Sequence, residues 1–219
     1  MQYNNFEKLR NNSRSWLDGI SAADKRYFQV IQTLEEMLRL FDGNRNNGDV
    51  EAIHPLGIFA HMRQFHHLLE DPITLYMVIL MHDALEDKRK RGVNEDYLNR
   101  LIGGYATEKV ILLTKEEGYV EEQYHQRIWL DSIASLGKGG DRVNNNGTAI
   151  STFKPHRLYR YRQENVDRFI PGFKISRLKF PQHAPIFHNM KMIVHSQVQA
   201  MDRVLEGYTP EQAAADTKA

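Results

Sequence analysis

The sequence predicts an all-α fold, and three observations lead to this prediction. Apolar residues recur at helical spacing along much of the chain, and no stretch alternates polar and apolar residues for long enough to require a sheet. Neither an internal repeat nor a low-complexity tract interrupts this pattern. With 219 residues, of which 41% are hydrophobic and 26% charged, the chain has the composition of a globular protein with a sizeable core.

The first half of the chain contains three well-marked helices. An apolar stripe predicts a helix over residues 23–41, and the Gly- and Asn-rich segment that follows predicts a loop. The next helix should begin near Pro55, because proline fits the first turn of a helix. Asp71 and Pro72 predict another start, with Asp71 as the N-cap residue. From there we expect one strongly apolar helix, PITLYMVILMHDALED.

The second half is punctuated by glycine and proline. We expect helices at the ranges 94–102, 106–114, 120–135, 155–168 and 188–205. The glycine-rich segment 137–147 and the proline-punctuated segment 171–185 are not assigned to helices. The sequence therefore predicts a main domain over 1–170, with its core at about 23–170, and a helical extension over 171–219 packed on the same domain.

Composition limits the functions that are open to the chain. The 29 basic and 28 acidic residues give a formal charge of +1, so no global field favours nucleic acid or a membrane. Cysteine is absent, which excludes disulfides and thiolate ligands and leaves His, Asp and Glu for any metal site. No secretory signal is visible at the N-terminus, so a cytoplasmic protein is expected. A homo-oligomer stays open.

A pair of adjacent polar residues, His82 and Asp83, stands at the polar end of the apolar helix that starts at Pro72. Both groups would be costly to bury without partners, and a divalent cation would remove that cost. Glu86 and Asp87 follow one helical turn later and could serve in acid–base chemistry. The alternative interpretation is a solvated helix end whose acids are neutralised by the basic turn that follows.

Two further polar residues favour the metal interpretation. His54 opens a helix, with Pro55 after it, and Asp141 lies among glycines and polar residues with no apolar face to explain it. The order His…His-Asp…Asp resembles the signature of the HD phosphohydrolase superfamily. HPLG (54–57), HDALED (82–87) and DRVNN (141–145) are similar to motifs of one branch, the hydrolase domains of bifunctional alarmone enzymes and the small alarmone hydrolases. This resemblance covers roughly residues 23–170.

The resemblance implies a helical bundle in which His54, His82, Asp83 and Asp141 bind a divalent metal, expected to be Mn²⁺. It assigns Glu86 and Asp87 to activation of the attacking water and protonation of the leaving group. The implied reaction removes the 3′-pyrophosphate of guanosine tetra- or pentaphosphate, a small-molecule nucleotide. The residues that would bind this substrate are Arg45, Arg142, Asn145, Thr148, Lys154 and Arg162.

Alternatives remain at several of these positions. Arg142 could pair with a carboxylate of the acidic cluster at 82–87 and hold it in place, and Asn145 could cap a turn. An HD-type hydrolase of deoxynucleoside triphosphates or nucleoside monophosphates is the rival enzyme, and it is favoured by Asn144, where the alarmone branch usually has His. A third hypothesis is a non-catalytic module that binds a nucleotide.

Overall fold

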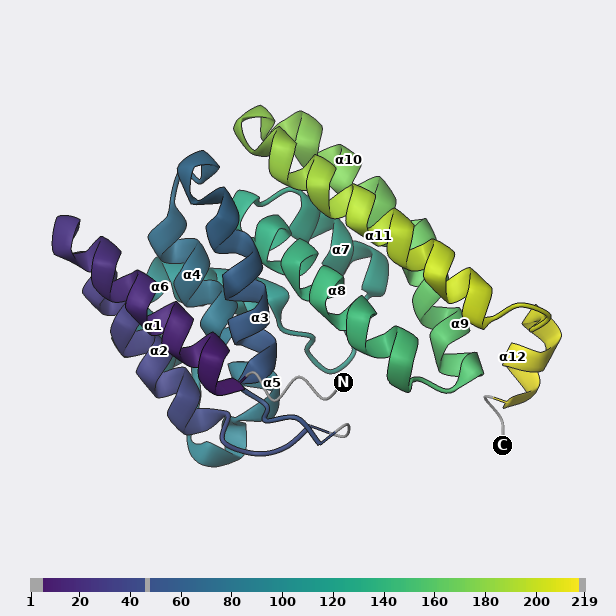
Figure 1. Cartoon of the computed structure of the whole chain (residues 1–219), viewed down its shortest axis with the longest axis horizontal. Helices are drawn as coiled ribbons and strands as arrows, with labels where there is room; N and C mark the ends of the chain where they lie inside the picture. The colour runs from purple at the N-terminus through teal and green to yellow at the C-terminus, as the bar shows by residue number, and fades with distance from the viewer. Residues whose placement is uncertain (1–5, 46–47, 217–219) are drawn as a thin grey trace. The chain divides into compact units, whose positions relative to one another are not determined.

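The computed structural model describes residues 6–45 and 48–216, and it confirms the all-α prediction (Figure 1). The described residues contain no β-strand, although an isolated antiparallel bridge joins Asn44 and Val50. Among them, no helix combines the length and apolar character needed to cross a membrane. The helices are α1 (Phe6–Ala23), α2 (Tyr27–Leu40), α3 (Ile53–Met62), η1 (Arg63–Leu68), α4 (Pro72–Met81), α5 (Ala84–Asp87), η2 (Arg89–Arg91), α6 (Glu95–Leu113), α7 (Glu121–Trp129), α8 (Ser132–Thr152), α9 (Pro155–Glu164), η3 (Asn165–Phe169, a π-helical turn), α10 (Ile170–Lys179), η4 (Pro181–His183), α11 (Ala184–Val204) and α12 (Pro210–Asp216).

The chain divides into two compact units, residues 1–138 and 139–219. The division falls inside α8, which is a single helix in the structure. In the first unit, α4 packs against α2, α3 and α6, and eight of its ten residues are buried. Apolar side chains all round a helix are what a central position requires. His82 and Asp83 therefore follow the end of the central helix of this unit.

The start of α4 is as the sequence predicts, but its end is not. The side chain of Asp71 accepts a hydrogen bond from the backbone N–H of Thr74 (3.0 Å), and Pro72 occupies the first turn. The helix stops at Met81, and Asp83, at φ −92° and ψ 0°, lies in the bridge region between α4 and α5. The expected continuous helix over 72–87 is therefore interrupted at the two residues that carry the candidate ligands.

The glycine-rich segment 137–147 is helical, because its glycines make room for close packing. Within the first unit, a Cβ built on Gly137 would lie 3.4 Å from Cδ1 of Leu113. Within the second unit, a Cβ on Gly139 would lie only 2.4 Å from Sδ of Met190 and 2.8 Å from Cε1 of Phe173. A Cβ would be blocked at Gly139, whereas at Gly137 it would make an ordinary contact, so the close packing at Gly139 is what offsets the low helix propensity of glycine.

Among the other helices, α1, α10 and α12 were not expected from the sequence. The buried residues of α1 are Leu17 and two serines, so the sequence shows too few apolar positions at helical spacing to predict this helix. α10 lies in the proline-punctuated segment, where Pro171 occupies the first turn of the helix rather than interrupting it. In the second unit α10 packs against α11, which also contacts α9. A buried amide pair, Asn146 and Asn165, joins α8 to the π-helical turn.

Candidate metal centre

The protonation of His82 is fixed by its neighbour one turn back. Its Nδ1 lies 2.8 Å from the carbonyl oxygen of Ile79, and because a carbonyl can only accept, Nδ1 carries the proton. The other ring nitrogen, Nε2, lies 3.1 Å from Oδ1 of Asp83. His82 is only 8% exposed. A backbone carbonyl that orients an imidazole in this way is the usual second partner of a metal-binding histidine.

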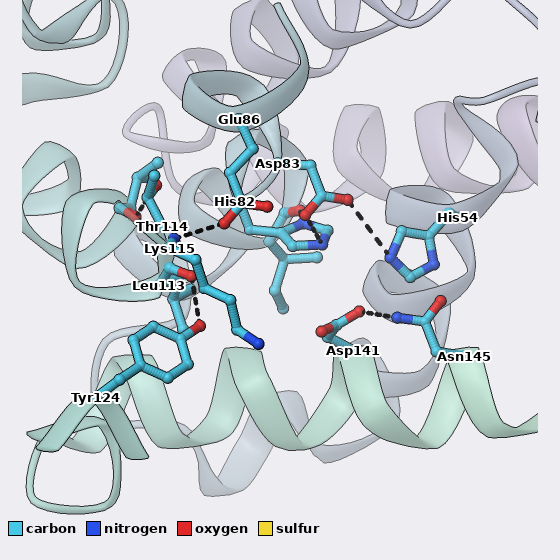
Figure 2. A network of polar contacts seen from close by, with 12 residues as sticks. His54, His82, Asp83, Glu86, Leu113, Thr114, Lys115, Tyr124, Asp141 and Asn145 are labelled. Atoms are coloured by element: carbon cyan, nitrogen blue, oxygen red, sulfur yellow. Dashed lines mark hydrogen bonds and ion pairs between the residues drawn. The ribbon is translucent and has the colours of Figure 1, made fainter. Parts of the chain in front are cut away.

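His54 lies in the first turn of α3, and its side chain is close to Asp83 as well. Its backbone N–H donates to the carbonyl oxygen of Glu51 (3.2 Å), and its side chain is 4% exposed. His54 Nε2 lies 3.8 Å from Oδ2 of Asp83, and the ring centroids of His54 and His82 are 5.2 Å apart. Figure 2 shows the carboxylate of Asp83 reaching toward both imidazoles. The first unit therefore brings three of the four predicted ligands together.

Asp141 lies on α8 and is 7% exposed. Its Oδ1 accepts a hydrogen bond from the side-chain amide of Asn145, one turn further along the helix (Figure 2). His54, His82 and Asp141 each offer one ligand atom, and these atoms lie within 4.8 Å of one another. This buried group could hold a metal ion, as the order of the motifs predicted. The participation of Asp83 and the identity of the metal stay predictions.

The chemistry of this donor set fits a divalent cation. Two imidazole nitrogens and two carboxylate oxygens suit a first-row divalent metal. The side chain of Asp83 is 34% exposed, so solvent reaches this part of the group. An ion held here would therefore be accessible to water or to a substrate.

The acidic pair on α5 differs in surroundings. Glu86 Oε1 accepts a hydrogen bond from the backbone N–H of Lys115 (2.6 Å). Desolvation, assisted by the negative charge of Asp83, raises the pKa of Asp87, although Lys88 opposes the shift. A raised pKa keeps the Asp87 carboxyl protonated to a higher pH than an ordinary aspartate. The two acids are thus placed to take different roles in proton transfer.

A cavity of about 500 Å³ lies beside Glu86 and is large enough for a small ligand. Its walls include the cationic residues Arg89 and Lys115, together with Leu85, Thr114 and the acidic pair 116–117. Neither cation was predicted to bind substrate. With Glu86 included, the lining carries three carboxylates and two cations, so the cavity is of mixed charge.

The predicted nucleotide contacts on α8 separate into two groups. Asn145 and Thr148 follow Asp141 by four and seven residues, so they share its face of the helix. Arg142 lies on another face, 6% exposed, where its Nη2 donates to Oε2 of Glu164 (2.5 Å). Its guanidinium carbon is 3.9 Å from the ring centroid of Tyr161. The carboxylate partner of Arg142 is therefore Glu164 on α9, which lies outside the acidic cluster that the alternative named.

The remaining predicted substrate residues lie in varied settings. Arg45 is half-buried in the loop before α3, where its backbone N–H donates to the carbonyl oxygen of Asp49 (2.7 Å). Lys154 is exposed and directly precedes α9. Arg162 Nε donates to Oδ1 of Asp202 (2.8 Å), so it holds α9 to α11. Roles for these three residues in substrate binding stay predictions.

Comparison with known proteins adds no assignment. The chain matches no protein-family model and no curated protein. The relation to the HD superfamily therefore rests on the motifs in the sequence, and it stays a prediction.

Proposed function

We propose that this protein is a metal-dependent phosphohydrolase. The observation that carries the proposal is the buried group of His54, His82 and Asp141, whose ligand atoms lie within 4.8 Å of one another. An acidic pair, Glu86 and Asp87, follows the candidate ligands on α5. A metal centre with adjacent acid–base groups is the equipment that hydrolysis of a phosphoester or phosphoanhydride needs.

In this proposal His54, His82 and Asp141 hold the metal, with Asp83 as the fourth ligand, and Mn²⁺ is the expected ion. The bound cation supplies Lewis acidity, which polarises a phosphoryl oxygen and makes water a stronger acid. The carbonyl of Ile79 keeps the Nε2 lone pair of His82 directed at the centre.

The acidic pair handles the protons. Glu86 takes a proton from the attacking water, and the backbone N–H of Lys115 holds its carboxylate in place for this task. Asp87, whose pKa is raised, gives a proton to the departing oxygen. The phosphorus–oxygen bond to the leaving group breaks as the bond to the water oxygen forms, so one water is consumed in each turnover.

We propose guanosine tetra- or pentaphosphate as the substrate, cleaved at the 3′ position to give GDP or GTP and pyrophosphate. Three features support this choice. The motifs resemble the alarmone branch, and Asn145 and Thr148 share the face of α8 that carries Asp141. Arg89 and Lys115 line the cavity beside Glu86, where they could neutralise phosphoryl oxygens.

One observation favours the rival enzyme, a hydrolase of deoxynucleoside triphosphates or nucleoside monophosphates. Arg142, one of the cations expected to bind the pyrophosphate, is taken up by Glu164 and by the Tyr161 ring. The second candidate does not need a cation at this position.

The deciding experiment incubates the purified full chain and Mn²⁺ with guanosine tetraphosphate, the deoxynucleoside triphosphates and the nucleoside monophosphates in parallel. Release of pyrophosphate from guanosine tetraphosphate alone supports the alarmone substrate. Turnover of the other nucleotides in its place supports the rival. Binding of nucleotide without turnover of any of them would contradict both and favour a non-catalytic module.

A further inference from the structure

The basic turn after the acidic pair, residues 88–91, does more than neutralise neighbouring acids. Lys88 is 7% exposed, and its Nζ lies 2.5 Å from Oε2 of Glu51 and 4.7 Å from the ring centroid of Phe41. A lysine this deeply buried is unusual unless it is paired, and here both a carboxylate and an aromatic ring receive its charge. Lys88 therefore belongs to the interior of the first unit rather than to its solvated surface.

Arg91 makes a second attachment from the same turn. Its Nη1 donates to the carbonyl oxygen of Leu40 (2.7 Å) and to that of Arg39 (3.1 Å). Its Nη2 lies 2.7 Å from Oδ1 of Asp42. The carbonyls belong to the C-terminal end of α2, where a cation is favoured by the helix dipole. Arg91 thus ties the turn to the start of the loop between α2 and α3.

Lys88 and Arg91 both contact the segment that precedes α3, and this segment leads directly to the candidate ligand His54. Backbone hydrogen bonds hold the two ends of this segment together. The N–H of Glu51 donates to the carbonyl oxygen of Gly43 (2.8 Å), and the N–H of Ala52 donates to the carbonyl oxygen of Phe41 (3.1 Å). The carbonyl of Glu51 accepts from the N–H of His54 (3.2 Å). Glu51 therefore accepts hydrogen bonds from both residues, from Lys88 through its side chain and from His54 through its backbone carbonyl.

The second residue of this ion pair, Lys88, is directly linked to the acidic pair on α5. Lys88 directly follows Asp87, and its backbone N–H donates to the carbonyl oxygen of Ala84 in α5 (3.0 Å). A shift of the Lys88 side chain would therefore be transmitted to α5, and a shift of Glu51 to the first turn of α3.

We propose that Lys88 and Glu51, assisted by Arg91, form a clasp that fixes the His54 segment and its Arg45 loop against the helix that carries Glu86 and Asp87. Lys88 and Glu51 are positioning residues in this proposal and do not touch the substrate. The inference rests on the proposed metal centre, but it does not depend on which substrate is cleaved.

An ion pair suits this task better than an apolar contact does. A buried ion pair adds little net stability over apolar residues of similar volume, so stability alone is a weak reason for it. Its geometry, however, is directional, and residues that orient metal ligands from outside the ligand set typically change metal affinity or activity about 10–100-fold when they are removed. The clasp should therefore affect the centre more than it affects folding.

The test uses four single variants of the full chain and the double variant Lys88→Met/Glu51→Gln. Lys88→Met keeps an unbranched apolar stem against Phe41 but removes the charge, and Glu51→Gln keeps the shape of the partner. Lys88→Arg restores the charge. Lys90→Met is the matched control, because Lys90 stands in the same turn and is exposed. For each variant, we would measure Mn²⁺ affinity by calorimetry with the metal alone, the melting temperature, and kcat and KM where turnover is found.

We expect Lys88→Met and Glu51→Gln each to lower Mn²⁺ affinity by about tenfold or more, and to lower kcat more than they raise KM. The double variant should lose no more than the worse single variant, since both changes break one interaction. Lys88→Arg should recover part of the loss, and Lys90→Met should match the wild type.

Wild-type Mn²⁺ affinity in folded Lys88→Met or Glu51→Gln protein would overturn the clasp, as would additive losses in the double variant. If Lys88→Met fails to fold, the isosteric Glu51→Gln carries the test. Absence of turnover in the wild type would count against the proposed function, whereas the clasp would still be judged on Mn²⁺ affinity.

Discussion

At the scale of single residues, the candidate centre depends on how each polar atom is held. His82 donates from Nδ1 to Ile79, which leaves Nε2 to face Asp83, and Asp83 turns its carboxylate toward both imidazoles. The carboxylate of Glu86 accepts a hydrogen bond from the backbone N–H of Lys115. Ligands and acid–base residues that are close in sequence should therefore respond differently to substitution.

Removal of Asp83 should affect the metal, and removal of Glu86 should affect only turnover. We expect Asp83→Ala to lose bound Mn²⁺ and all activity, because a ligand charge is removed. Glu86→Ala should keep its metal and lose turnover by about 10²–10⁴-fold, the range typical of a missing general base. Metal content by mass spectrometry and steady-state rates provide the measurements. Loss of metal from Glu86→Ala would show that Glu86 is a ligand.

His66 should make the first unit sensitive to acid. Desolvation, with a smaller contribution from the charge of His67, lowers the pKa of His66, whose Nδ1 lies 3.1 Å from the Tyr76 hydroxyl. The unfolded chain therefore binds more protons at this residue, so its stabilising contribution is present above the ordinary pKa of about 6.5 and is lost as the pH falls through that value.

His66→Gln should flatten the decline of the melting temperature between about pH 7 and pH 5, the interval in which an unperturbed histidine titrates. The exposed His188→Gln is the control and should leave that decline unchanged. An identical pH slope in wild type and His66→Gln would refute this account of the acid sensitivity.

At this scale, sequence reasoning singled out the candidate ligands but not the residues that we propose to position them. His54, His82 and Asp141 stand out because each is a polar group that its own segment does not explain. Lys88 and Glu51 do not stand out, since they are 37 positions apart and each is an ordinary charged residue in a polar stretch. Only the fold shows that one is buried against the other.

At the scale of secondary structure, α8 is the most informative element. Its glycines argue against a helix when the segment is considered alone, and the helix forms because neighbouring side chains occupy the space that a Cβ would fill. Local propensity predicted α4 and its cap well, because Asp71 and Pro72 act on their own segment. It could not predict α8 or α10, whose helical state depends on packing within the fold.

Two glycines of α8 should respond in opposite ways to alanine. Gly139→Ala should destabilise the protein by about 1–3 kcal/mol, because the new methyl group collides with Met190 and Phe173. Gly147→Ala meets nothing within 4 Å and should stabilise it by about 0.5–1 kcal/mol through helix propensity. Urea denaturation measures both changes. Equal effects of the two substitutions would contradict the packing explanation.

At the scale of the whole molecule, no disulfide adds to stability, because the chain has no cysteine. The folded state is therefore stabilised by the burial of apolar side chains and by any ligand that binds to it. The proposed metal would join ligands that come from three separate places in the sequence. Binding of an ion to such a set stabilises the folded state alone, since the unfolded chain does not hold the ligands together.

Mn²⁺ should therefore raise the melting temperature. At a free concentration of about one hundred times its dissociation constant, the ion adds about 2.7 kcal/mol, which corresponds to roughly 5–10 °C for a protein of this size. Scanning calorimetry with Mn²⁺ and with a chelator measures the shift, and Asp83→Ala serves as the control in which the shift should vanish. A shift of equal size in that variant would mean that the ion binds elsewhere.

The most direct test of the central claim is the anomalous diffraction signal of a crystal grown with Mn²⁺. We expect one strong peak at bonding distance from Nε2 of His82, a ring nitrogen of His54 and the carboxylates of Asp83 and Asp141. A peak away from these four side chains, or a well-occupied Mn²⁺ that Asp141 does not touch, would contradict the proposed centre.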